Sequence, residues 1–303
     1  MRSVMSTLRA RRNALKTLGL GALALAGADP LRALAAAGKP RRIVSVGGAL
    51  TEIVYALSAE ADLVGVDTTS LYPASAQKLP SVGYARTLSS EGVLALAPTD
   101  VIATEEAGPP TVLQQVKAAG IPVTVMNSNY RFEGLLERIR RVGQIIGRDE
   151  PAARLAQTLQ QQWSATRQEQ ARRKHAPVRV LFVLAHAPNQ IMVGGRDTGA
   201  DAMIAYAGAL NVLGGPAGFA GYKPLTPEAV IAARPDVVLV TDQGVQASGG
   251  VDGILKLPGL EQTPAGRSRR VVSLEAMYLL GFGPRLPAAV AALDAALVKA
   301  MPA

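Results

Sequence analysis

Few residues in this chain are able to do chemistry, and their types limit what that chemistry can be. The sequence has no cysteine and only two histidines, His175 and His186, among 303 residues. It therefore has no disulfide, thiolate metal site, iron–sulfur cluster or cysteine nucleophile, and too few imidazoles for a histidine-rich zinc site. No Gly-x-Ser-x-Gly turn, Walker loop or His-Glu-x-x-His motif occurs. These features argue against an enzyme.

One tyrosine has a position that suits a ligand residue. Tyr72 lies in the segment Thr69-Ser70-Leu71-Tyr72-Pro73, shortly after an apolar run, 63–66, that is typical of a strand. Ligand-binding loops of open α/β sheets lie at the carboxyl ends of strands, and Pro73 restricts the backbone beside the phenol. The alternative is an ordinary loop tyrosine whose hydroxyl faces water.

An internal repeat places glutamates at matching positions. Residues 88–98 and 225–235 share Leu, Glu, Val, Ala and Pro at a constant offset of 137. Glu91 and Glu228 are the repeated acids, each in the first turn of an expected helix. A Gly-Tyr pair and then a basic residue, Arg86 or Lys223, precede each copy. Two homologous lobes would explain these matching residues. The alternative is that helix–Pro–strand units resemble one another in any case and that acids favour helix N-termini.

Alternating strand and helix patterns position these residues. Strands are expected at 41–46, 63–66, 101–103, 123–125, 178–184, 237–240 and 271–274, and helices at 50–57, 111–119, 199–208 and 287–301. This alternation predicts an α/β fold with mostly parallel central sheets. Between the two series, helical stretches at 131–146 and 149–174 form a long connector without a strand pattern. We expect an N-terminal lobe (38–128), a connecting helix (129–176) and a C-terminal lobe (177–303).

The first 37 residues have the order of an export signal. Paired arginines, Arg11 and Arg12, precede the apolar run 18–28, and small residues follow it. Such a pair is typical of a twin-arginine signal, although Ala14 stands where that motif prefers Phe; a basic membrane anchor is the alternative. Residues 1–37 carry six Lys/Arg and one Asp, so the net charge of +9 falls to +4 without them. The remaining charge does not call for a nucleic-acid partner.

Five motifs, in this order, carry a resemblance to a known family. They are Val46-Gly47-Gly48-Ala49-Leu50-Thr51-Glu52, Thr69-Ser70-Leu71-Tyr72-Pro73, Leu79-Pro80-Ser81-Val82-Gly83-Tyr84, Gly194-Gly195-Arg196-Asp197-Thr198 and Gly221-Tyr222-Lys223-Pro224-Leu225. Together they resemble the periplasmic haem-binding proteins of ABC haem importers, which are helical-backbone (class III) substrate-binding proteins. The resemblance covers 41–300. It implies two homologous lobes joined by a long helix, and no enzymatic activity.

The resemblance also implies a ligand and a site. Haem would be captured in the periplasm, downstream of an outer-membrane haem receptor, and delivered to an inner-membrane ABC permease with its ATPase subunits. Tyr72 would be the axial ligand of the haem iron. Lys223, Arg86 and Arg196 would be candidates for the propionates, and His186 for a second stacked haem. Apolar walls would come from Tyr84, Tyr222, Phe219 and Met192.

The same resemblance assigns Glu91 and Glu228 to permease docking, one on each lobe. Helix capping alone is the competing explanation for these acids. Because the fold does not determine the ligand, a siderophore or cobalamin binder of the same fold remains an alternative. An exported α/β hydrolase-like enzyme is the alternative from another class, although no serine lies in a suitable turn.

Overall fold

The computed structural model describes residues 40–172, 176–187, 190–216 and 218–301, the side chains of 185–187 and 190 excepted. The predicted export signal, 1–37, lies outside these residues. In the described part of the chain, the N-terminal lobe has a four-stranded parallel sheet in the order β2-β1-β3-β4. Its strands are β1 (Ile43–Val46), β2 (Leu63–Val66), β3 (Asp100–Thr104) and β4 (Val123–Met126). Helices α2 (Gly48–Ala56), α3 (Ser90–Leu94) and α4 (Pro110–Ala118) accompany them, with short 3-10 turns at Glu60–Asp62, Ala76–Lys78 and Ala85–Thr87.

Different helices cover the two faces of this sheet. Side chains of β1 alternate between them, as a strand requires. Ile43 belongs to a core with apolar residues of α2 and of α5 (Phe132–Ile146). Val44 and Val46 pack into a separate core with Val93 of α3 and Val116 of α4. All four β1 residues are buried, as is typical of a central parallel strand covered on both faces.

The C-terminal lobe has a six-stranded mixed sheet within the described residues. Across the sheet, the neighbouring strands are in the order β10-β9-β5-β6-β8, and β7 pairs with the start of β5. Their bounds are β5 (Arg179–Ala187), β6 (Gln190–Gly194), β7 (Leu210–Asn211), β8 (Tyr222–Pro224), β9 (Val237–Thr241) and β10 (Val271–Leu274). The sequence patterns indicated β5, β9 and β10 but not β6, β7 and β8. Strand β6 pairs antiparallel with β5 and with β8. The helices are α7 (Gly199–Tyr206), α8 (Pro227–Ala233), α9 (Asp242–Ala247), α10 (Val251–Leu255), α11 (Pro264–Arg267), α12 (Ala276–Leu280) and α13 (Leu286–Ala300).

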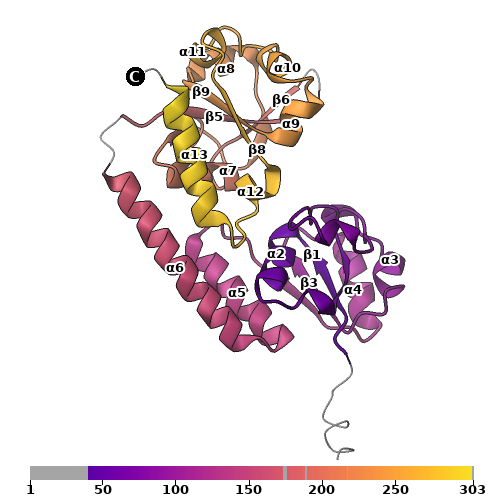
Figure 1. Cartoon of the computed structure of the whole chain (residues 1–303). Coiled ribbons are helices and arrows are strands. Elements are labelled where there is room, and N and C mark those ends of the chain that lie inside the picture. The colour runs from indigo at the N-terminus through magenta and orange to yellow at the C-terminus, as the bar shows by residue number, and fades with distance from the viewer. Residues whose placement is uncertain (1–39, 173–175, 188–189, 217, 302–303) are drawn as a thin grey trace, which may run out of the picture. The chain divides into compact units, whose positions relative to one another are not determined.

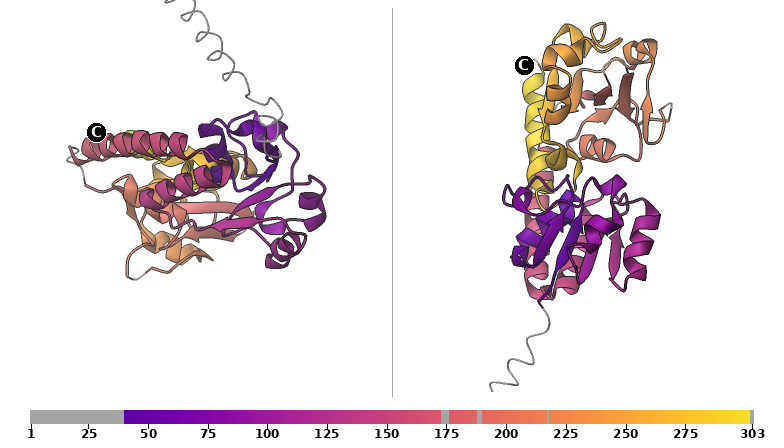
Figure 2. Two further views of the ribbon diagram at one scale, coloured as in Figure 1. Left: turned by 90° about the horizontal axis from the view of Figure 1, so that it is seen from below. Right: turned by 90° about the vertical axis from the view of Figure 1, so that its right-hand side faces the viewer.

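Two helices make up the connecting segment, α5 and α6 (Asp149–Ala171). Gly147, in the left-handed region at φ 66°, ends α5. The helices then pack so closely that a Cβ on Gly143 would lie 2.5 Å from the side chain of Ala152. Helix α6 packs against α5 and against α13 of the C-terminal lobe, as the views in Figures 1 and 2 show. The long helix α6 thus joins the two lobes.

The internal repeat is present in the backbone register. Ile43 pairs with Asp100 in one sheet, and Val180 pairs with Val237 in the other, so both partners shift by 137 residues. The parallel strands β7-β5-β9-β10 therefore repeat the order β2-β1-β3-β4. The two lobes are homologous, and β6 and β8 are additions to the second.

An arginine performs the same task in each lobe. Arg42 donates to the carbonyls of Leu96 and Ala97 at 2.7 and 2.9 Å. Arg179, 137 residues later, donates to the carbonyls of Ala233 and Arg234 at 2.8 and 3.2 Å. Each guanidinium thereby satisfies orphan carbonyls at the end of a short helix.

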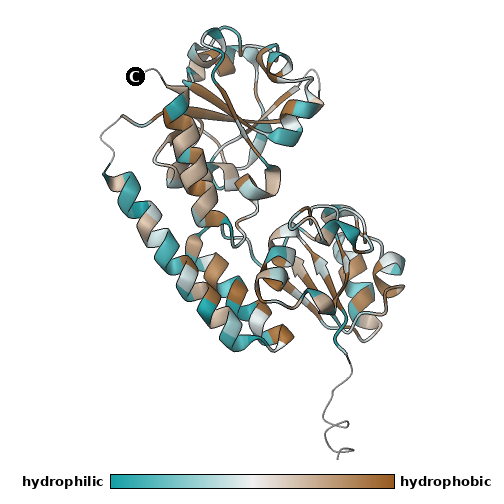
Figure 3. Cartoon of the chain, viewed as in Figure 1, coloured by the Kyte–Doolittle hydropathy of each residue, from teal (hydrophilic) through white to brown (hydrophobic). Residues whose placement is uncertain are grey.

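One hydrophobic core runs through both lobes and the connector. It includes Ile43 and Leu50 of the N-terminal lobe, Leu135 of α5, Leu159 of α6 and Leu293 of α13. In Figure 3 the strands of both sheets are largely brown, whereas α6 carries much teal. Among the described residues, no helix has both the length and the apolar content that a membrane span needs, and no group of three or more His, Asp or Glu is placed to hold a metal ion.

The continuous core predicts that the lobes move little relative to each other. Separating them would expose apolar surface of α2, α5 and α13 and break contacts of the stiff helix α6. We expect the radius of gyration from small-angle scattering to change by less than about 1 Å between the free and the ligand-loaded protein. A large compaction on loading would contradict this expectation.

Candidate functional site

The loop that follows β2 is organised by a buried aspartate. Asp67 is 2% exposed, and its Oδ1 accepts from the Gly47 amide at 2.8 Å and from the Ser70 hydroxyl at 3.0 Å. Its Oδ2 accepts from the amide and the hydroxyl of Thr69 at 3.0 and 2.7 Å. A carboxylate with four donors is well satisfied despite its burial. The loop that carries Tyr72 is therefore fixed at its base.

Close backbone contacts hold the same loop against α2. The Gly48 amide donates to the Thr69 hydroxyl at 2.9 Å, and a Cβ on Gly48 would lie 2.4 Å from the Thr69 carbonyl oxygen. The Thr51 hydroxyl lies 2.8 Å from that of Ser70. The Gly-Gly pair and the Thr-Ser loop, noted as separate motifs in the sequence, thus form one unit.

Exposed phenols cluster in the segments that the sequence singled out. Tyr72 is 49% exposed, Tyr84 is 45% exposed and Tyr222 is 36% exposed. No described residue forms a hydrogen bond with the hydroxyl of Tyr72 or Tyr84. Two unpaired phenols are therefore available to an incoming ligand. Tyr222 differs: its ring is partly exposed, but desolvation of its hydroxyl raises its pKa, and hydrogen bonds to Thr198 and Ala200 oppose that rise.

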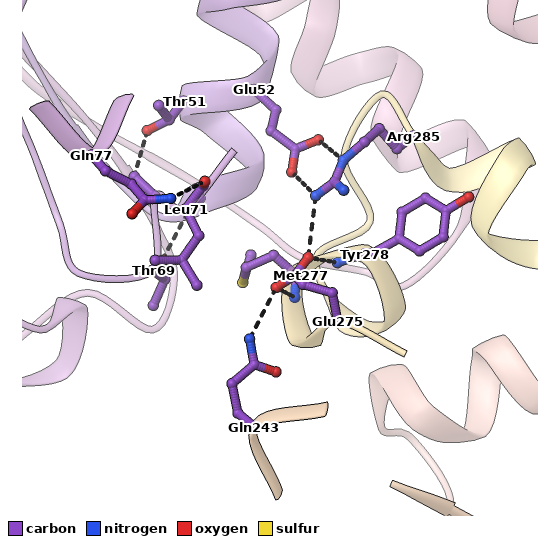
Figure 4. Close-up of polar contacts among 12 residues, drawn as sticks. Thr51, Glu52, Thr69, Leu71, Gln77, Gln243, Glu275, Met277, Tyr278 and Arg285 are labelled. Carbon is purple, nitrogen blue, oxygen red and sulfur yellow. Dashed lines mark hydrogen bonds and ion pairs between the residues drawn. The ribbon is translucent and has the colours of Figure 1, made fainter. Parts of the chain in front are cut away.

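Arg285 covers the ring of Tyr72, with its Cζ 4.1 Å from the ring centroid. Its Nε donates to Oε2 of Glu52 at 2.9 Å, and its Nη2 donates to Oε1 at 2.5 Å, a two-pronged pair that Figure 4 shows. Glu52 is 5% exposed. Burial raises the pKa of the Glu52 carboxyl, and the hydrogen bonds and charge of Arg285 oppose that rise. Removing one partner of a buried ion pair costs about 3–5 kcal/mol.

No sequence pattern predicted this ion pair. Its partners are 233 residues apart in the chain, and no local pattern links them. One signal was present: Glu52 is an acid within a mostly apolar helix, and buried acids are almost always paired. That signal predicts a cationic partner without identifying it.

A second group of charges surrounds Glu106. Arg86 lies 3.8 Å from its carboxylate, and the Tyr130 hydroxyl donates to it at 3.3 Å. Burial and the negative charge of Glu106 raise the pKa of Tyr130 to about 12. The charges of Arg86 and Glu106 also act on Tyr222 of the other lobe. That Arg86 and Lys223 serve one site stays a prediction.

The remaining predicted site residues have varied surroundings. Lys223 is exposed in β8, with its Nζ 5.3 Å from the centroid of the Phe219 ring. Arg196 donates from Nη1 to the Gly215 carbonyl at 2.8 Å, so one of its two terminal nitrogens supports a neighbouring loop. His186 lies in β5, but its side chain is outside the described residues, as is all of His175.

A family match identifies the class of protein to which this site belongs. The model of the family described as periplasmic binding protein matches residues 43–278, most of the chain. The chain belongs to the periplasmic binding protein family. This confirms the predicted substrate-binding fold and the prediction that the chain is not an enzyme.

Solved structures of periplasmic binding proteins include relatives with known ligands. The periplasmic heme-binding protein BhuT, solved with two hemes, is 48% identical, with a TM-score of 0.82 over 86% of this chain and 98% of that one. The periplasmic heme-binding protein RhuT from Roseiflexus sp. RS-1 is 45% identical, with the same TM-score and coverage. The heme-binding protein HutB of Vibrio cholerae is 40% identical, with a TM-score of 0.74 and the same coverage.

Curated relatives of this binding protein are more distant. An uncharacterized ABC transporter substrate-binding lipoprotein, YvrC of Bacillus subtilis, is 27% identical over 82% of this chain and 77% of its own length. The vitamin B12-binding protein of Pectobacterium atrosepticum is 24% identical over 66% and 71%, respectively. Both are binding proteins, which is consistent with the absence of enzyme motifs in this sequence.

The two repeated glutamates of this binding protein occupy equivalent surface positions. Glu91 is the second residue of α3 and Glu228 the second of α8, and both are exposed. The side-chain caps come from other residues: the Ser89 hydroxyl accepts from Gly92 N, and the Thr226 hydroxyl accepts from Ala229 N, each at 3.3 Å. Neither glutamate is therefore needed as the hydrogen-bonding cap of its helix, and both carboxylates are free to face a partner.

Proposed function

We propose that this binding protein captures haem outside the cytoplasm and delivers it to an ABC permease. Its similarity to haem-binding proteins of the same fold, at 40–48% identity, supports this function. The observation that carries it in this chain is a pair of exposed phenols without hydrogen-bond partners, Tyr72 and Tyr84, in motif segments of the site.

The chemistry of these phenols suits ferric haem. A phenolate oxygen is an established ligand of haem iron. Its proton must leave from a group with an ordinary pKa of about 10, and the charge of the iron with a nearby cation favours that loss. Tyr72, the ligand expected from the sequence, has Arg285 against its ring. Tyr84 is also a candidate iron ligand, because no described residue bonds to its hydroxyl and Arg86 follows two residues later.

We further assign the propionates to the basic side chains near the site. Lys223 and Arg86 are exposed and come from different lobes. Arg196 contributes a single free end of its guanidinium, because the other end holds Gly215. His186 remains our candidate for a second haem, since BhuT was solved with two hemes.

A hemin titration of the purified protein tests the function directly. We expect a high-spin ferric spectrum with a charge-transfer band of the tyrosinate type, and the end point gives one or two haems per chain. The matched control is bovine serum albumin at the same concentration, which reports non-specific hemin uptake. A featureless, albumin-like titration would contradict haem capture through a phenolate.

Cobalamin is the second candidate ligand, because this chain also resembles vitamin B12-binding proteins. Cobalamin is large and needs no phenolate. A calorimetric titration with cyanocobalamin shows which of the two ligands the protein binds. Tight cobalamin binding together with weak hemin binding would reverse the assignment.

We also propose that the chain reaches its compartment by export. The export signal would be residues 1–37 with the twin-arginine pair Arg11 and Arg12, and the lobes would span 38–128 and 177–303 around a 129–176 connector. Glu91 and Glu228 would dock the two lobes onto the two halves of the permease. Haem would arrive from an outer-membrane receptor.

A further inference from the structure

The guanidinium of Arg285 lies at the junction of the two lobes. It belongs to the residue that precedes α13, and its hydrogen-bond partner Glu52 lies in α2. It also lies over two rings, that of Tyr72 at 4.1 Å and that of Tyr278 at 5.0 Å. One cation thus contacts the loop of the proposed haem site, a helix of the N-terminal lobe and a helix of the C-terminal lobe.

The second carboxylate at this cation, that of Glu275, is held rigidly. Its Oε1 accepts from the Met277 amide at 2.7 Å and its Oε2 from the Tyr278 amide at 2.8 Å, at the start of α12. Gln243, which follows β9, bonds to Glu275 at 3.4 Å and accepts from the Ala276 amide at 3.1 Å. Figure 4 shows this series of contacts from Gln243 to Glu52. Arg285 lies 3.4 Å from Glu275, so the C-terminal lobe also holds the guanidinium that pairs with Glu52.

The ring of Tyr72 has no comparable anchor in its own lobe, although Gln77 Nε2 donates to the carbonyl of the preceding Leu71 at 2.8 Å. The base of its loop is fixed by Asp67, but the ring is half exposed and its hydroxyl has no hydrogen-bond partner among the described residues. The contact with the Arg285 guanidinium is the polar interaction that orients the ring. Cation–π contacts contribute more when the cation is desolvated, and the Arg285 side chain is 23% exposed.

We propose that Arg285 is a positioning residue of the haem site. It holds Tyr72 and its loop in the binding arrangement, and it links that arrangement to the contact between α2 and α13. Because Glu52 lies in α2 and Arg285 directly precedes α13, even a small shift between these two helices would weaken the pair with Glu52 and the hold on the Tyr72 ring. This inference rests on the proposed haem function.

Release kinetics test the proposal. The wild-type protein is loaded with hemin, and transfer to excess apomyoglobin is followed by absorbance, with the spectrum of the complex recorded first. Partners that orient a metal ligand are worth about 10–100-fold in metal affinity, so we expect Arg285→Ala to release hemin about tenfold faster and with an altered visible spectrum. Arg285→Lys should fall between the two, since lysine keeps the charge but loses the two-pronged geometry.

A matched control distinguishes this role from a general effect of losing an ion pair between an arginine and a carboxylate. Arg269 pairs with Asp252 on the surface of the C-terminal lobe, and both side chains are largely exposed. Arg269→Ala should release hemin at the wild-type rate.

A second variant guards against loss of the fold, because removing Arg285 alone leaves the buried Glu52 unpaired. The double variant Glu52→Met with Arg285→Met replaces both charges by apolar groups, an exchange that is often neutral for stability. We expect it to keep a near-wild-type thermal midpoint and still release hemin about as fast as Arg285→Ala. Wild-type release rates in both variants would overturn the role of Arg285 while leaving the proposed function intact. Failure of the wild-type protein to bind hemin would overturn both.

Discussion

The hemin complex is expected to lose its tyrosinate absorption when Tyr72 and Tyr84 are both replaced by phenylalanine. The rings remain, so the apolar contacts are kept, but the two unpaired hydroxyls of the site are gone. Because the iron–oxygen bond is lost, we expect hemin affinity to fall by about 100-fold or more, which corresponds to about 2.8 kcal/mol. Absorption spectroscopy and titration measure both effects.

The single variants assign the ligand. If the assignment from the sequence holds, Tyr72→Phe alone removes the band and Tyr84→Phe retains it; the opposite pattern assigns the iron to Tyr84. Tyr55, which packs at the edge of the core on α2, provides the control, and Tyr55→Phe should leave the spectrum unchanged. A tyrosinate band that survives in the double variant would contradict phenolate ligation by this site.

Transport by the reconstituted permease is expected to fall sharply when Glu91 and Glu228 are both replaced by alanine. The two acids lie at equivalent places on homologous lobes, as a two-fold symmetric permease requires of its partner. Their hydrogen-bonding caps, Ser89 and Thr226, stay in place. Hemin affinity should therefore be unchanged, and the measurements are vesicle uptake and a hemin titration on the same preparation.

The two single variants and a neighbouring acid complete this test. Each single replacement should reduce uptake by less than the double replacement, because one lobe keeps its contact. Glu261, an exposed acid of the C-terminal lobe outside the repeat, is the control, and Glu261→Ala should transport normally. Normal uptake by the double variant, with stability lowered by about 0.3–1 kcal/mol, would mean that these acids only support their helices electrostatically.

Much of the fold could be predicted from the sequence, because parallel strands and the helices between them have strong local patterns. The largely apolar strands near Val44 and Val238 and the constant offset between the repeats were enough to anticipate two related lobes. Strands β6 and β8 were missed because each is short. Strand β8 also pairs with the earlier strand β6 across an intervening helix, whereas β6 directly follows its partner β5 in the chain. Short strands paired across many residues leave little trace in a local window.

The candidate site was only partly predictable for the same reason. Motifs identified the loop of Tyr72, because its residues are neighbours in the sequence. The supporting contacts join Asp67 to Gly47 and Glu52 to Arg285, and these pairs form only when the chain folds. Glu52 needs a cationic partner because it is buried, and burial depends on tertiary packing that a sequence pattern predicts poorly.

The core that includes both Ile43 and Leu293 has a consequence for the autonomy of the lobes. A duplicated half usually keeps a complete interior of its own and can be cut free. Here the apolar face of α6 and α13 completes an interior that begins in the other half. Cutting the chain after α6 would leave two fragments, each with an uncovered apolar flank. We therefore expect the two copies to unfold as one unit, because neither half completes this shared core on its own.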